Sequence, residues 1–163
     1  MLMSRPKNLR PTGPVTPVTE THRARMAPPE SGPRPHVPVL LVQAWDCGAD
    51  CRETLQLWGF RAAATADIEE ALRMVAEHDC RALVVDLDLP RVDVLALVTA
   101  LRTTSATRDV TIVATTRGND EAIDALARES GCDVVLTGAI DPHALAMELE
   151  AALAHPGRRC AVA

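Results

Sequence analysis

Two carboxylates lie at the end of an apolar run in the stretch ALVVDLDLP, residues 82–90. Four apolar residues precede Asp86, and Asp88 follows it two positions later. A short apolar run of this kind is typical of a buried strand in a parallel sheet. Because ligands of open α/β sheets bind outside the carboxyl ends of the strands, Asp86 is a candidate for binding or catalysis.

Apolar runs and helical patterns alternate through the part of the chain that surrounds this stretch. Strands are predicted at residues 39–42, 61–65, 82–86, 110–115 and 133–137. Helices are predicted at about residues 48–59, 67–78, 94–102, 121–130 and 142–154. Five strand–helix units with short connections indicate an α/β fold, in which a parallel sheet is covered by helices on both faces.

Residue types at the predicted helix boundaries agree with this division. Asn119 is placed to cap the helix at residues 121–130. Asp141 is followed by Pro142, and proline suits the first position of a helix. The ends of the strands can therefore be named, and they are the positions at which function has to be sought.

The 163 residues have room for one domain of ordinary size and a tail. Nine of the twelve prolines lie within residues 1–38, a composition that cannot bury enough apolar surface to fold. Three parts are predicted: a proline-rich, basic, disordered tail (1–37), a folded domain (38–155) and a short C-terminal tail (156–163). A proline-reading domain or an acidic partner could dock on the first tail. Met1, Met3 and Met26 all remain candidates for the translation start.

Charge is distributed unevenly between the two parts. Residues 1–38 carry six Lys or Arg and two acids, whereas residues 39–163 carry eleven Arg and twenty acids. A domain with an excess of acidic residues repels the phosphates of nucleic acids, which disfavours a nucleic-acid partner. No apolar stretch approaches the roughly 20 residues that cross a bilayer, and the N-terminus lacks the regions of a secretory signal. We expect a cytoplasmic protein with no nucleic-acid or membrane partner.

Five cysteines occur in the chain, at positions 47, 51, 80, 132 and 160. Their odd number and scattered positions are a poor disulfide framework and fit a reducing compartment. Cys47 and Cys51 would share one face of a helix, but a metal site would need two further ligands at suitable spacing. We expect ordinary thiols and no metal site.

Three stretches together resemble the receiver domain of bacterial response regulators, over about residues 38–155. Asp86 in LVVDLDLP falls where that family has its phosphoacceptor aspartate, and Thr115 in TIVATT falls on its switch hydroxyl. ESGCDVVLTG (129–138) resembles the stretch that leads into the family's fifth strand. The resemblance implies a flavodoxin-like (βα)5 fold with a five-stranded parallel sheet in the order 2-1-3-4-5.

This sequence departs from the family at the residues that make the aspartate reactive. Gln43 and Ala44 stand where the family has the acidic pair that holds Mg²⁺, and Gly138 stands where it has a lysine. Val135 takes the place of the switch aromatic. Lys7 is the only lysine of the chain, so the domain has none of its own.

Phosphoryl transfer to an aspartate depends on groups that meet the developing negative charge. Asp46 and Asp50 could supply acids, and Arg91 or Arg117 a cation, although a guanidinium does not replace a compact ammonium. Three interpretations of Asp86 stay open. It is a working phosphoacceptor, a retained but inactive one, or a structural carboxylate that caps a loop or helix.

The resemblance favours a degenerate receiver, a signalling module of a two-component or phosphorelay pathway that is not an enzyme. The chain ends at Ala163 soon after the last predicted helix, so we expect a stand-alone module that acts by protein contact. A sensor histidine kinase or a downstream effector would bind helix four, strand five and helix five, and a homodimer is a further option. With weak or no Mg²⁺-dependent phosphorylation, no cofactor is expected.

Two alternatives remain. The first is a functional response regulator, phosphorylated on Asp86 by a histidine kinase with Mg²⁺ as its cofactor. The second is a phosphatase that uses an aspartate-x-aspartate pair, which Asp86 and Asp88 match. The absence of lysine from the domain disfavours that chemistry.

Overall fold

The computed structural model describes residues 36–43, 48–90 and 92–155, and the side chains of residues 48–50 are not included. The predicted N-terminal tail lies outside the described residues except at its last two positions, and the C-terminal tail lies outside them entirely. The first strand begins at Val37, one residue before the predicted start of the domain.

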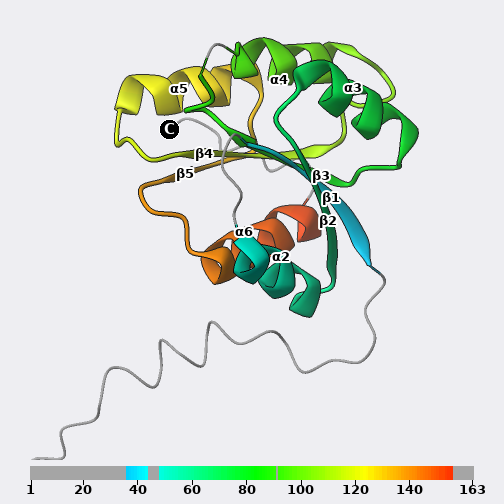
Figure 1. Cartoon of the computed structure of the whole chain (residues 1–163). Helices are drawn as coiled ribbons and strands as arrows, with labels where there is room; N and C mark the ends of the chain where they lie inside the picture. The colour runs from blue at the N-terminus through cyan, green and yellow to red at the C-terminus, as the bar shows by residue number, and fades with distance from the viewer. Residues whose placement is uncertain (1–35, 44–47, 91, 156–163) are drawn as a thin grey trace, which may run out of the picture.

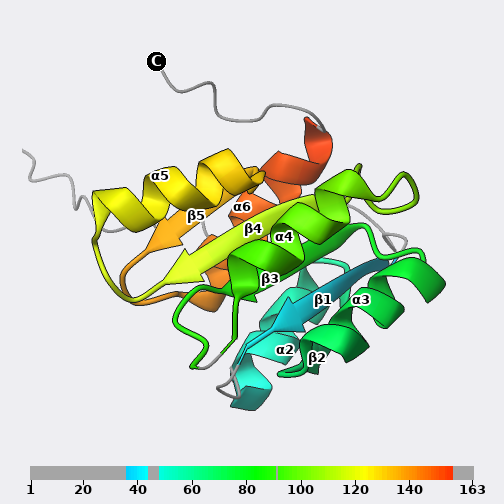
Figure 2. The same cartoon turned by 90° about the horizontal axis from the view of Figure 1, so that it is seen from above.

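The described residues form one five-stranded sheet, in which every pair of neighbouring strands is parallel and the order is β2-β1-β3-β4-β5 (Figure 2). The strands are β1 (Val37–Val42), β2 (Phe60–Thr65), β3 (Ala82–Asp86), β4 (Thr111–Thr116) and β5 (Val134–Thr137). The helices that follow them in turn are α2 (Gly48–Leu57), α3 (Ile68–Glu77), α4 (Val94–Thr103), α5 (Glu121–Ser130) and α6 (Pro142–Ala154). The predicted fold class and strand order are confirmed.

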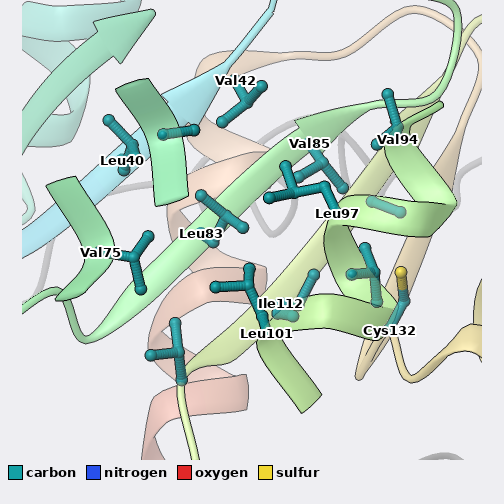
Figure 3. Close-up of a cluster of buried hydrophobic side chains, with 14 of the residues drawn as sticks. Leu40, Val42, Val75, Leu83, Val85, Val94, Leu97, Leu101, Ile112 and Cys132 are labelled. Atoms are coloured by element: carbon teal, nitrogen blue, oxygen red, sulfur yellow. The ribbon is translucent and has the colours of Figure 1, made fainter. Parts of the chain in front are cut away.

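Helices cover both faces of the sheet, with α3, α4 and α5 on one side and α2 and α6 on the other (Figure 1). Successive residues of a strand point to opposite faces, so each strand feeds two core clusters. In β3, Leu83 and Val85 belong to the cluster that contains Leu97 of α4 (Figure 3). Ala82 and Val84 belong to the cluster with α2 and α6. Because the central strands are buried on both faces, apolar residues occupy successive positions in each of them, and their polar residues are confined to Asp86 and the threonines of β4.

Aspartates cap four of the helices. The N-caps of α3, α4, α5 and α6 are Asp67, Asp93, Asp120 and Asp141, and each carboxylate accepts a hydrogen bond from a backbone N–H of the first turn. The prediction that Asn119 caps α5 is wrong. The cap is the next residue, Asp120, whose Oδ1 accepts from Ala122 N at 2.9 Å. A carboxylate at this end also interacts favourably with the helix dipole, which a neutral amide does not match.

Cys51, Cys80 and Cys132 are buried in the core. Burial raises the pKa of the Cys80 thiol, and it raises the pKa of Cys132 to about 12. A thiol becomes a nucleophile only as its thiolate, so these two side chains pack as small apolar groups at neutral pH. Within the described part of the chain, none of the helices is long and apolar enough to span a membrane.

A buried ion pair joins the end of α4 to the segment before β5. Arg102 Nη2 lies 2.7 Å from Asp133 Oδ2, and the two side chains are 11% and 14% exposed. The guanidinium also donates to three backbone carbonyl oxygens, those of Arg108, Val110 and Gly131. Arg102 therefore satisfies groups from two loops at the edge of the sheet opposite Asp86.

Replacing Arg102 with alanine should lower the free energy of unfolding by about 3–5 kcal/mol, because the largely buried Asp133 carboxylate loses its cation and keeps only the N–H of Ile112. Arg73→Ala is the matched control. Arg73 is 60% exposed and lies 3.8 and 3.9 Å from Glu70 and Glu77, so its loss should cost less than about 1 kcal/mol. Urea denaturation followed by circular dichroism measures both. Equal losses in the two variants would contradict this role of Arg102.

Candidate functional site

The parallel register brings the predicted site residues to one edge of the sheet. Asp86, the last residue of β3, pairs with Thr115 of β4. Val42 of β1 pairs with Val85 of β3, so Gln43 follows on the β1 side of Asp86. The strands β1, β3 and β4 lie side by side in this order (Figure 2). The structure therefore brings Gln43, Asp86 and Thr115 to the carboxyl ends of three neighbouring strands.

Asp86 is almost completely buried, with 4% of its surface exposed. Its Oδ1 accepts a hydrogen bond from Asp88 N at 2.9 Å, and its backbone carbonyl oxygen accepts from Leu89 N at 3.3 Å. The carboxylate thus caps the turn that follows β3. This contact is the structural role that one interpretation of Asp86 assigns to it, and it leaves Asp86 at the strand end where a phosphoacceptor belongs.

Thr115 is buried beside Asp86. Its Oγ1 donates to the carbonyl oxygen of Val85 at 3.4 Å, and its own carbonyl oxygen accepts from Leu87 N at 2.8 Å. Both bonds join β4 to the backbone of β3 and its following turn. The hydroxyl therefore bonds to the residue that precedes Asp86, and it is directed at the backbone of the neighbouring strand.

Asp88 has a more definite role than its sequence position indicates. Its Oδ2 accepts from Arg117 N at 2.7 Å and lies 3.5 Å from Arg117 Nε. Its Oδ1 accepts from Thr116 Oγ1 at 3.2 Å. The bond from Arg117 N is the largest cause that lowers the pKa of the Asp88 carboxyl. Asp88 therefore links the turn after β3 to the turn after β4.

Sequence reasoning missed this link. The sequence offers Arg117 only as a candidate cation for Asp86, whereas the structure pairs it with Asp88. The available signal was the strand register: Asp88 lies two residues after Asp86, and Arg117 lies two residues after Thr115, its partner in β4. Two residues of opposite charge that follow paired strand positions by the same number of residues can approach each other beyond the strand ends. The bend of each turn, which decides the contact, is not visible in the sequence.

Gly138 lies just beyond the end of β5, and its N–H donates to Thr116 O at 2.9 Å. A Cβ at this position would have no heavy atom within 4 Å, but φ is +89°. Space for a longer side chain is thus present, while the left-handed backbone disfavours any residue except glycine. Val135, at the position of the family's aromatic, is partly buried against the core.

The residues that the structure describes do not fit a magnesium site of the kind that the resemblance implies. Mg²⁺ prefers carboxylate and water oxygens, and Gln43 offers only a neutral amide beside Asp86. No group of three or more His, Cys, Asp or Glu side chains within the described ranges could hold a metal ion. Ala44, Asp46, Arg91 and the side chain of Asp50 lie outside those ranges.

The lowered pKa of Asp88 makes the stability of the domain depend on pH in one direction. A carboxyl whose pKa is lower in the folded state stabilises that state above its unfolded pKa of about 3.9, and the contribution is lost as pH falls through the folded value. The difference in unfolding free energy between wild type and Asp88→Asn should stay constant from about pH 7 to pH 5 and shrink below about pH 4. Urea titrations across this range measure it. A difference that grows on acidification would contradict the assignment.

Solved structures of several receiver domains are similar to this fold. A putative response regulator from Chloroflexus aurantiacus is 27% identical, covers 75% of this chain and 100% of its own, and superposes with a TM-score of 0.67. The receiver domain of a sensor histidine kinase from Pseudomonas aeruginosa, with a magnesium ion in its active-site cleft, is 21% identical, with coverages of 74% and 99% and a TM-score of 0.64. A chemotaxis response regulator of Vibrio cholerae is 21% identical, with coverages of 71% and 98% and a TM-score of 0.60.

No match is found among curated protein sequences. The family model that describes the response regulator receiver domain matches residues 47–150. The match begins after Gln43 and Ala44 and includes Asp86, Thr115 and Gly138. It spans well over half of the chain, and the chain therefore belongs to the response regulator receiver domains of two-component signalling.

Proposed function

We propose that this receiver domain acts as a signalling module through contact with other proteins, without catalytic activity of its own, and that phosphorylation of Asp86 is slow or absent. The observation that carries the proposal is the set of groups around Asp86. Gln43 lies beside it at the end of β1, and Gly138 occupies the position of the lysine. Among the residues that the structure describes, Arg117 is a candidate cation for this site, and it is paired with Asp88.

The missing groups matter because phosphoryl transfer is mostly a matter of charge compensation. The three equatorial oxygens of the transferred group need a metal ion, a lysine or strong hydrogen-bond donors. Removing one such component commonly costs about 10²–10³ in rate. In this chain both the acidic pair and the lysine are replaced by neutral residues, so two components are lost together.

Arg117 is a weak replacement for the lysine. Its side chain is 75% exposed, which places much of the guanidinium in water, and its Nε lies 3.5 Å from Asp88. Moving it to a phosphoryl group on Asp86 would leave the Asp88 carboxylate without that partner. The planar guanidinium also differs from an ammonium in shape and hydration. The exposure of Arg117 and its pairing with Asp88 therefore support the proposal that phosphorylation of Asp86 is slow or absent.

The face formed by α5, β5 and α6 is the surface that we propose for partner binding. The strand β5 is an edge of the sheet and lies between α5 and α6 (Figure 2). Ile123 and Leu126 on α5 are 37% and 51% exposed, although both are large apolar side chains. Val134 and Leu136 of β5 are only partly buried. A histidine kinase, an effector or a second copy of the chain are the candidate partners.

Phosphorylation by acetyl phosphate with Mg²⁺, followed by intact-protein mass spectrometry, tests the proposal. We expect little or no gain of a phosphoryl group by the wild type. The variant that combines Gln43→Asp, Ala44→Asp and Gly138→Lys should react at least about 10²-fold faster, because it restores the metal ligands and the cation. Calorimetric titration with Mg²⁺ should show binding to that variant and none to the wild type.

Asp86→Asn is the control for the site of modification, and it should remove any phosphoryl gain from the restored variant. A stoichiometric gain by the wild type that disappears in Asp86→Asn would overturn the proposal. It would favour the alternative, a response regulator phosphorylated on Asp86. The position of Asp86 beside Thr115 at the strand ends is the observation that keeps this alternative in view.

A further inference from the structure

The carboxylate of Asp88 receives three polar contacts from Thr116, the last residue of β4, and from Arg117, which follows it. The donors are Arg117 N at 2.7 Å, Thr116 Oγ1 at 3.2 Å and Arg117 Nε at 3.5 Å. Thr116 Oγ1 in turn accepts from Gly118 N at 3.2 Å. Both oxygens of one carboxylate thus hold the start of the β4–α5 loop, residues 117–120, against the turn that follows β3.

This loop is short, so an anchor at its start also restrains the helix that follows it. Four residues separate Thr116, the end of β4, from Glu121, the start of α5. Within the first turn of α5, Ala122 N donates to Asp120 Oδ1 and Asp124 N donates to Asp120 O. The exposed apolar residues Ile123 and Leu126 are on the same helix. Hydrogen bonds of Asp88 and of Asp120 therefore restrain the two ends of the short loop that leads to this surface.

The carboxylates of Asp86 and Asp88 have separate partners in these contacts. Asp86 is bound to Asp88 through the backbone N–H of Asp88, at Asp86 Oδ1. The side chain of Asp88 is directed to β4 and its loop. The bond at Asp86 Oδ1 uses the backbone N–H of Asp88 and none of the three donors to the Asp88 carboxylate.

We propose that Asp88 is a built-in anion, which holds the β4–α5 loop and the exposed side of α5 in one arrangement that does not depend on the state of Asp86. The proposal deepens the proposed function and rests on it, since a module without an active phosphorylation site needs another means of fixing its binding surface. The lowered pKa of Asp88 agrees with a carboxylate that is charged throughout the physiological range.

Backbone amide hydrogen exchange, measured by NMR on the full chain without any phosphodonor, tests this inference. In Asp88→Ala, exchange of the Ala122 and Asp124 amides should become about tenfold faster, because hydrogen bonds to a charged acceptor are lost and the loop opens more often. In Arg117→Ala the increase should be only about two- to fivefold. That variant loses an exposed ion pair and keeps the backbone N–H that bonds to Asp88.

Two controls separate release of the loop from other effects. Arg128→Ala removes the ion pair with Asp124 on the same helix, at 3.1 Å, and should change exchange at Ala122 by no more than about twofold. Asp86→Asn should likewise stay within about twofold of wild type at both amides. Asp88→Asn, which retains the shape of the side chain and loses its charge, should give an increase between those of Arg117→Ala and Asp88→Ala.

Faster exchange in Asp88→Ala that is confined to the Arg117 amide would overturn the inference, because the contact would then be purely local. An acceleration in Asp86→Asn as large as that in Asp88→Ala would overturn the claimed independence from Asp86. Unchanged exchange at Val84 and Ile112 in the core is required for the expected result to count as support, and a general acceleration there in both Asp88 variants would count against it. The outcome does not involve phosphorylation, so it is separate from the test of the proposed function.

Discussion

The backbone hydrogen bonds between β1, β3 and β4 are the constraint on which the rest of the molecule depends. A parallel ladder fixes which residues stand side by side, and a shift by one residue would turn every side chain to the opposite face of the sheet. In this register Asp86 pairs with Thr115, and Gln43 follows the pair formed by Val42 and Val85. The pairing of these strands, most of whose residues are apolar, thus decides which polar residues stand next to one another at the site.

Because the fold is held by these apolar strands, it does not require the polar groups at their ends. The residues of β3 and β4 are all buried, and they pack against helices on both faces. A substitution at Gln43 or Gly138 changes the charge at the ends of the strands, and it removes no contact from the core. The fold can therefore persist while the chemistry at its edge changes, which is why membership of a family and activity of its site are separate questions.

The parts of this structure that follow from short-range patterns could be predicted from the sequence. Apolar runs of strand length and helical spacing identified all the elements, and the alternation of strand and helix identified the parallel sheet. Asp86 was found because it ends such a run, and Thr115 because TIVATT resembles the strand that carries the switch hydroxyl of receiver domains. The link between Asp88 and Arg117 was missed, since it joins residues 29 positions apart through two turns. The cap of α5 was misplaced by one residue, because Asn119 and Asp120 are both good cap residues.

The left-handed backbone at Gly138 has a consequence for any lysine placed there. A residue with a Cβ would have to accept φ of +89°, at a cost of about 1–2 kcal/mol. A Cβ would meet no heavy atom within 4 Å, so this cost arises in the main chain and not from crowding. A lysine at this position therefore exchanges stability for charge, because it adds a cation after β5 and strains the turn that carries it.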